Sequence, residues 1–203
     1  MEDGAPRLCN LGALINTALQ RGDKGQRNHR NRFNGFPLAR PDVGLYSSPM
    51  SLHSYSRVWL HLVWSTLERR PFFRGAAAAK VSEDLYRYAE EKRIYMKINY
   101  VNPEHVHALV DLPTGLAIEE MMQLFKGASS RRINESNLLP GKFGWGRGYG
   151  VFSVSHSGMG EVAKYIAQQE EHHRKRDFSE ELKILVERYG LKWLDDKTAK
   201  AVL

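Results

Sequence analysis

Residues 94–112 have the sequence IYMKINYVNPEHVHALVDL, in which two strand patterns flank a short turn. Residues 94–101 alternate in polarity and residues 105–112 are mostly apolar, as is typical of half-buried and buried strands. Asn102 and Pro103 between them favour a tight turn. Because so few residues separate the two strands, we expect them to pair in antiparallel fashion.

The sequence on either side of this hairpin adds two more strands and four helices. Apolar, aromatic-rich segments predict the outer strands, and apolar residues at helical spacing predict the helices. The resulting order, β-α-β-β-α-β followed by helices, is typical of an α+β, ferredoxin-like split β-α-β fold: an antiparallel sheet with helices on one face, plus C-terminal helices. The expected elements are strands over 57–65 and 149–155 and helices over 74–92, 118–134, 160–173 and 179–189.

Composition narrows the class of protein. The chain has 203 residues and one cysteine, which excludes an internal disulfide. No run approaches the roughly 20 apolar residues of a membrane span, so we expect no membrane association. Lys and Arg outnumber Asp and Glu by 30 to 23, a balance that favours a polyanionic partner. Residues 1–49 are expected to be a disordered or non-essential basic extension, and residues 50–203 the folded domain.

His105 and His107 form the first candidate site. Side chains on a strand alternate between faces, so the two imidazoles point the same way while Val106 points to the other face. Two imidazoles at this spacing can bind one divalent ion. The alternative is that they are two partly buried or surface histidines without a ligand.

Tyr165 and Gln169, in the sequence YIAQQ, form the second candidate site. Residues at i and i+4 are neighbours on a helix face. A tyrosine can act as a covalent nucleophile, and a glutamine oxygen can complete the coordination of a hard cation. The alternative is that Tyr165 only packs into the core. Adjacent His172 and His173 point in directions about 100° apart on a helix, which argues against a joint metal site.

The combination of HVH on the third strand with YIAQQ on a late helix resembles the single-tyrosine HUH (His–hydrophobic–His) transposases. This family includes the small insertion-sequence transposases and the REP-associated tyrosine transposases. The strings RVWLHLVWSTLERRPFF, LFKGASSRRIN and GYGVFSVSHS are also similar to the family, and the likeness extends over residues 54–190.

The resemblance implies a reaction and its residues. The family cleaves and rejoins single-stranded DNA near hairpins through a covalent 5′-phosphotyrosine. By position, Tyr165 corresponds to the nucleophile, and His105, His107 and Gln169 correspond to the ligands of Mg²⁺ or Mn²⁺. The resemblance further implies a homodimer, in which the tyrosine helix serves either its own or the partner's histidine pair. It implies no nucleotide cofactor. It also implies a cytoplasmic bacterial protein that joins the nucleoid when bound to DNA.

Basic and aromatic residues predict the DNA-binding surface. Cations near the end of the second helix and just after the tyrosine helix would attract phosphates, although both groups also suit ordinary helix ends. In the glycine-rich loop 141–150, Trp145 is expected to stack on a base and Arg147 to meet a phosphate, unless Trp145 packs at the edge of the domain. The predicted DNA-binding residues are Lys126, Arg131, Arg132, Trp145, Arg147, Arg174, Lys175 and Arg176.

Two other functions remain open at this level. The same fold could belong to a domesticated REP-type protein that binds or nicks hairpin DNA. A non-catalytic, ferredoxin-like RNA-binding domain is the second alternative, but the aromatic residues form no clear RNA-binding string on a central strand. The presence of all four residues at the two candidate sites favours the enzyme.

Overall fold

The computed structural model describes residues 55–174 and 176–194 of the chain. Its order of elements confirms the β-α-β-β-α-β pattern followed by C-terminal helices. Residues 1–54 lie outside the described part, as does Lys175, so the expectations for the N-terminal extension and the exact domain limits stay predictions. The elements are β1 (Trp59–Ser65), the 3₁₀ turn η1 (Leu67–Arg69), α2 (Ala76–Glu91), β2 (Tyr95–Val101), β3 (His105–Asp111), α3 (Ile118–Glu135), β4 (Gly150–Val154), α4 (Met159–Ala167), α5 (Gln169–His173) and α6 (Phe178–Arg188).

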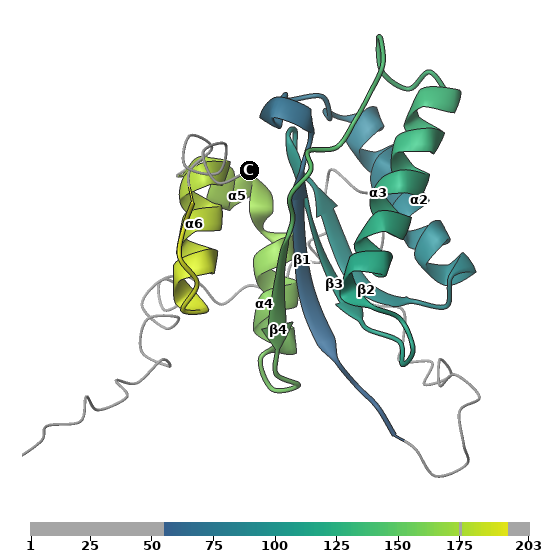
Figure 1. The fold of residues 1–203 in the computed structure, drawn as a ribbon. Helices are drawn as coiled ribbons and strands as arrows, with labels where there is room; N and C mark the ends of the chain where they lie inside the picture. The colour runs from purple at the N-terminus through teal and green to yellow at the C-terminus, as the bar shows by residue number, and fades with distance from the viewer. Residues whose placement is uncertain (1–54, 175, 195–203) are drawn as a thin grey trace, which may run out of the picture.

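The four strands form one antiparallel sheet in the order β2-β3-β1-β4. Helices α2 and α3 cover one face of this sheet, and α4, α5 and α6 lie on the other side (Figure 1). The α+β, ferredoxin-like class predicted from the sequence is therefore confirmed, with the C-terminal helices forming a third layer.

Residue parity along β1 and β3 decides what each face of the sheet carries. Leu60, Leu62 and Trp64 of β1 join the large core beneath α2 and α3. The intervening residues of β1 point to the opposite face, where Trp59 and Val63 are buried. Each fully buried aliphatic or aromatic side chain contributes roughly 1.5–3 kcal/mol, so the apolar face supplies much of the stability.

The helix expected over residues 160–173 is interrupted. α4 ends at Ala167, α5 begins at Gln169, and Gln168 between them has φ −100° and ψ 17°. Tyr165 and Gln169 therefore belong to different helical segments. The i, i+4 argument for their proximity does not apply as stated, and their relation has to be taken from the contacts that each side chain makes.

Helix α6 is attached to the second face by its own apolar contacts. Phe178 and Leu185 are buried in a cluster with Val63 of β1 and Phe152 of β4. The side chain of Asp177 caps the helix by accepting a hydrogen bond of 2.9 Å from the backbone N–H of Glu180. Among the helices of the described residues, none is long and apolar enough to cross a membrane.

Candidate active site

The two histidines of the HVH sequence lie side by side on the second face of the sheet. Both side chains are fully buried, and the Nε2 atoms of His105 and His107 are 3.0 Å apart. Strand parity explains this common orientation, because Val106 between them is directed into the core under α2 and α3. The structure therefore brings together the two residues of the first predicted site.

A third histidine, His61 of β1, contacts the His107 ring at Nδ1, the nitrogen that does not face His105. His61 Nε2 lies 2.9 Å from His107 Nδ1, and the two rings stack with centroids 5.2 Å apart. When His107 Nδ1 donates this hydrogen bond, its Nε2 is left as an acceptor facing the cluster. Burial, followed by the nearby His107, lowers the pKa of His61 to about 3, so its ring is neutral.

His61 was not among the predicted site residues, although the pairing of β1 with β3 brings it next to His107. His61 pairs with Leu109 across the β1–β3 ladder, and His107 is two residues from Leu109 on the same face. Diagonal neighbours of this kind on adjacent strands are within side-chain reach. The pairing could be inferred only once the register of β1 against β3 was known.

Tyr165 and Gln169 meet at one acidic side chain, Glu181 of α6. The Tyr165 hydroxyl donates a short hydrogen bond to Glu181 Oε1, and Gln169 Nε2 donates to the same oxygen over 2.8 Å. The Gln169 oxygen accepts from Asn102 Nδ2 at 3.2 Å. Burial and then the carboxylate of Glu181 raise the pKa of Tyr165 far above its ordinary value, so its phenol is protonated at rest.

Glu181 connects these residues to the histidine pair. It is 8% exposed, and its Oε1 lies 3.4 Å from His107 Nε2 while its Oε2 lies 3.8 Å from His105 Nε2. Burial alone would raise the pKa of Glu181, but the neighbouring imidazoles of His107 and His173 outweigh burial and hold it well below the usual range. Glu181 is therefore an ionised carboxylate inside the cluster.

Glu181 was not predicted as a site residue either. The one feature of the sequence that sets it apart is its position on the apolar side of the last predicted helix. Phe178, Leu182 and Leu185 form the apolar stripe of α6, and Glu181 falls within that stripe. An acidic residue on the buried face of an amphipathic helix is unusual unless it is paired. The sequence thus marks Glu181 as exceptional but does not reveal its partners, which are distant in the chain.

His173, at the end of α5, adds a further nitrogen to the cluster. Its Nε2 lies 3.1 Å from His105 Nε2 and 3.4 Å from Glu181 Oε2. His172 instead contacts the ring of Tyr165, with centroids 4.9 Å apart. The two adjacent histidines thus diverge, as their helical spacing predicts, and only His173 faces the cluster.

The ring of His105 is held from several directions. Phe178 stacks on it with centroids 4.0 Å apart, Asn102 Nδ2 lies 2.9 Å from its Nε2, and Glu104 Oε1 lies 3.3 Å from its Nδ1. Burial, partly opposed by Glu104, lowers the pKa of His105 to about 4. A neutral imidazole is the form that can bind a metal ion.

The cluster has the composition and spacing of a divalent-cation site. Ligand atoms of His105, His107 and Glu181 all lie within 4.8 Å of one another, and all three residues are buried. Neutral imidazole nitrogens and a carboxylate oxygen are ligand types that divalent ions accept. The donor set therefore fits a divalent ion.

The predicted DNA-binding residues on α3 lie on the opposite side of the sheet from this cluster. Arg132 makes two hydrogen bonds, of 2.9 and 3.0 Å, with the carboxylate of Glu91 and so joins α3 to α2. Lys126 donates to the backbone carbonyls of Arg147 and Gly148. Arg131 is exposed. Two of these three cations thus hold elements of the fold together.

The structure gives Trp145 a packing role. Its side chain is 8% exposed, it packs against Trp64 and Phe143, and its Nε1 donates to Ser129 Oγ over 2.9 Å. No face of the indole is free for a base in this arrangement, so the stacking role expected for it is corrected. The cause is a bridge between Trp145 and Thr66, which extends the edge of β1 into the loop.

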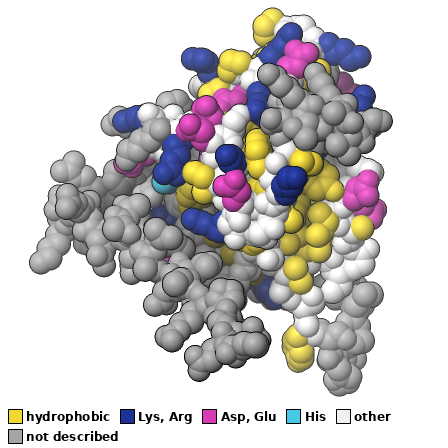
Figure 2. Space-filling model, turned by 60° about the vertical axis from the view of Figure 1, so that its left-hand side comes forward, with side chains coloured by type: hydrophobic (Ala, Val, Ile, Leu, Met, Phe, Trp, Pro, Cys, Tyr) yellow, Lys and Arg dark blue, Asp and Glu magenta, His cyan; other side chains and the backbone are white. Residues whose placement is uncertain are grey.

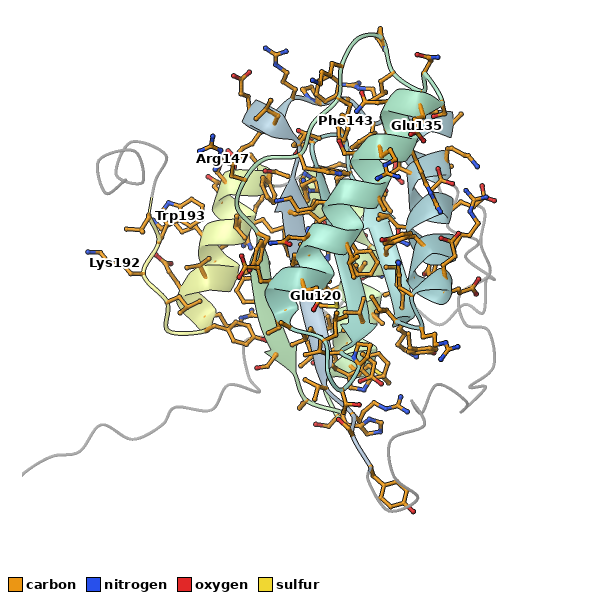
Figure 3. All side chains as sticks on the ribbon, turned by 45° about the vertical axis from the view of Figure 1, so that its right-hand side comes forward. Glu120, Glu135, Phe143, Arg147, Lys192 and Trp193 are labelled. Carbon is orange, nitrogen blue, oxygen red and sulfur yellow. The ribbon has the colours of Figure 1, made fainter. Side chains whose placement is uncertain are left out.

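The remaining cations are exposed. Arg147 points away from the molecule, whereas Phe143 lies inside it (Figure 3). Arg174 is exposed and lies 3.6 Å from Glu170, and Arg176 is exposed as well. Lys and Arg side chains on the face shown in Figure 2 are scattered among acidic ones rather than gathered in one patch. Lys175 lies outside the described residues.

Comparison with known proteins defines the class. A family model described as "Transposase IS200 like" matches residues 54–169, more than half of the chain, so this chain belongs to the IS200-like transposase family. The resemblance to the single-tyrosine transposases is thereby confirmed. The matched residues include the histidine pair, Tyr165 and Gln169, and they end before His173 and Glu181.

Three individual proteins are similar to this chain. The chain is 28% identical over 115 residues to the ISDra2 transposase TnpA of Deinococcus radiodurans, covering 54% of this chain and 81% of the relative. A crystal structure of a proposed transposase from Deinococcus radiodurans R1 aligns at 22% identity and a TM-score of 0.48, covering 60% of this chain and 98% of that one. A REP-associated tyrosine transposase bound to a REP hairpin aligns at 13% identity and a TM-score of 0.46, covering 61% and 74%.

Proposed function

We propose that this transposase cleaves and rejoins single-stranded DNA near hairpins, with Tyr165 as its nucleophile. The observation that carries the proposal is the position of the Tyr165 hydroxyl. It is hydrogen-bonded to a carboxylate that also contacts His107 and His105, and all four groups belong to one chain. A nucleophile beside a site that can bind a divalent cation is an arrangement suited to phosphoryl transfer.

In the proposed reaction the phenolic oxygen of Tyr165 attacks the scissile phosphorus. The bond between phosphorus and the 3′ oxygen breaks, the phenolic proton is lost, and the 3′ oxygen leaves as a hydroxyl after gaining a proton. The product is a 5′-phosphotyrosine ester and a free 3′-OH. Attack by a 3′-OH from another strand reverses these steps, and since the ester conserves the bond energy, rejoining needs no nucleotide cofactor.

The proposed cofactor is Mg²⁺ or Mn²⁺, held by His105, His107 and Gln169. When bound there, a divalent ion would polarise the scissile phosphate and stabilise the charge that develops on it. The chain itself orients the reacting groups. His61 fixes the His107 ring, Asn102 contacts both His105 and Gln169, and the carboxylate of Glu181 holds the Tyr165 hydroxyl in position.

DNA is proposed to reach this site over exposed cations. Arg131, Arg147, Arg174 and Arg176 are exposed and available to phosphates, and Lys175 continues the last group in sequence. Lys126 and Arg132 would have to contact DNA while keeping, or exchanging, their contacts within the fold. Phosphate contacts of this kind position DNA without selecting its sequence.

The assembly is proposed to be a homodimer that acts in the cytoplasm, where bacterial chromosomal DNA lies. The cluster joins Tyr165 to the histidine pair of its own chain, so this arrangement does not require a partner to supply the tyrosine. A dimer of such subunits would provide two cuts, one from each tyrosine.

Substitution of Tyr165 by Phe tests the nucleophile. The full chain is incubated with labelled hairpin-bearing single strands and Mn²⁺, and a covalent protein–DNA band is sought by denaturing electrophoresis. We expect Tyr165→Phe to abolish the band, because it removes the attacking oxygen. Tyr149→Phe is the matched control, since Tyr149 is 44% exposed and precedes β4.

The outcomes separate the alternatives. An adduct that persists in Tyr165→Phe would refute the assignment of the nucleophile. Hairpin binding by the unsubstituted chain without any covalent band would instead identify a domesticated hairpin-binding protein.

A further inference from the structure

Glu181 contributes the only carboxylate that touches both imidazoles of the HVH pair among the described residues, yet it lies beyond the stretch that matches the family. We propose that Glu181 is itself a ligand of the divalent cation, so that α6 completes the metal site. This inference rests on the proposed function, and it adds a ligand from the C-terminal helix to those on β3 and α5.

The spacing of the atoms is that of ligands around a single ion. Ligands bound at about 2.1 Å and at right angles to each other lie about 3.0 Å apart. His105 Nε2 and His107 Nε2 are 3.0 Å apart, and Glu181 Oε1 is 3.4 Å from His107 Nε2. Glu181 Oε2 is 3.8 Å from His105 Nε2. Both carboxylate distances fall between the separation of ligands at right angles, about 3.0 Å, and that of opposite ligands, about 4.2 Å.

Charge favours the same assignment. His105, His107 and Gln169 would all bind a divalent ion as neutral groups, so the ion would keep its full charge in a buried place. The ion-pair partners of Glu181 within the described chain are His105, His107 and His173, none of which carries a permanent charge. A buried carboxylate and a buried cation stabilise each other strongly. Glu104, the other carboxylate near the pair, contacts His105 at Nδ1 rather than at the Nε2 that faces His107.

The neighbouring side chains direct the carboxylate towards the imidazoles. Gln169 Nε2 and the Tyr165 hydroxyl donate to Oε1, and His173 Nε2 lies 3.4 Å from Oε2. Gln169 thus turns its nitrogen, not its oxygen, to the carboxylate. In this arrangement Glu181 presents oxygen atoms to both imidazoles, and Gln169 supports it.

Contacts other than those of Glu181 also hold α6 in position. Phe178 and Leu185 anchor the helix in the apolar cluster, and Asp177 caps its first turn. Replacing Glu181 by Gln keeps the shape of the side chain and leaves these contacts in place. Glu180, its exposed neighbour in the same turn, provides a matched control of the same charge change.

The test compares Mn²⁺ binding by calorimetry in the unsubstituted full chain and in three variants, with thermal unfolding monitored for each. We expect Glu181→Gln to weaken binding at least about tenfold, Glu180→Gln to leave it unchanged, and His107→Ala to abolish it. Binding by folded Glu181→Gln that equals that of the unsubstituted chain would overturn the inference, while loss in His107→Ala would leave the proposed function standing. Absence of Mn²⁺ binding by the unsubstituted chain would overturn both.

A crystal structure of the unsubstituted protein grown with Mn²⁺ answers the question even if Glu181→Gln fails to fold. A Glu181 oxygen at about 2.1 Å from the ion is the expected result. A Glu181 carboxylate more than about 3.5 Å from an ion held by the two imidazoles would show that it only positions other groups, whatever the binding data.

Discussion

Alternate residues of the central strands β1 and β3 point to opposite faces of the sheet, and the two faces carry different kinds of residue. Towards α2 and α3, strand β1 presents Leu60, Leu62 and Trp64, which are all buried in an apolar core. Towards α4, α5 and α6, the alternate positions of β1 and β3 include His61, His105 and His107. One face thus carries the larger apolar core, whereas the other combines two smaller apolar clusters with buried polar groups that need specific partners.

This division teaches that stability and chemistry can be separated experimentally in this fold. Substitutions on the apolar face should lower the free energy of unfolding while leaving the chemistry of the folded fraction intact. Substitutions among the histidines should impair the chemistry and leave the free energy of unfolding nearly unchanged, provided that the cavities they leave are small. Three variants test the division, and one of them, His107→Ala, also serves in the Mn²⁺-binding experiment above.

The largest effect on chemistry is expected for His107→Ala. The change removes one imidazole from the proposed cation site and leaves His61 without its hydrogen-bond partner. Metal-dependent cleavage should fall by about 10²–10³-fold, as for loss of one electrostatic stabiliser of a transition state. Cleavage of a labelled hairpin strand and DNA binding are measured in parallel, and some binding should remain. Unchanged cleavage would remove His107 from the reaction.

Leu62→Ala tests the opposite face. Leu62 is fully buried beneath α2 and α3, so the substitution leaves a cavity in the large core. The free energy of unfolding should fall by about 2–5 kcal/mol in urea denaturation. At a temperature where the variant is folded, the cleavage rate should match that of the unsubstituted protein. A large loss of cleavage in the folded variant would show that the faces are coupled.

His61→Phe is expected to affect the chemistry less than His107→Ala does. Phenylalanine keeps the stacking with His107 but cannot form the hydrogen bond with His107 Nδ1, so the orientation of the His107 ring is less defined. Affinity for Mn²⁺ should fall by about 10–100-fold, the usual cost of losing an outer hydrogen bond to a metal ligand. His61→Gln, which retains an acceptor, should recover part of the affinity. Equal affinity in all three proteins would reduce His61 to a packing residue.

The elements and the histidine pair were predictable because they depend on local pattern. Alternation along β3 places His105 and His107 on one face whatever the tertiary structure, and the order of elements predicts the sheet. His61 and Glu181 were not predictable, since their partners lie far away in the chain and meet only through strand register and helix docking.

Two local predictions failed for identifiable reasons. Trp145 was assigned to DNA because its loop is rich in glycine, but backbone pairing with Thr66 draws the indole into the core. Gly146 permits this close approach: a Cβ atom there would lie 3.1 Å from Ser65 Oγ and 3.3 Å from the Thr66 carbonyl. The continuous helix over 160–173 failed at Gln168, where no glycine or proline marks the break.

The location of Glu181 on α6 bears on how this protein can be dissected. A fragment that ends with the family-matched stretch, at Gln169, would retain all four strands, Tyr165 and the HVH pair. It would lack the acid at the centre of the cluster, together with Phe178, which stacks on His105. With the role proposed for Glu181, the residues needed for the reaction extend beyond the stretch that matches the family, and we expect a minimal active fragment to extend through Arg188.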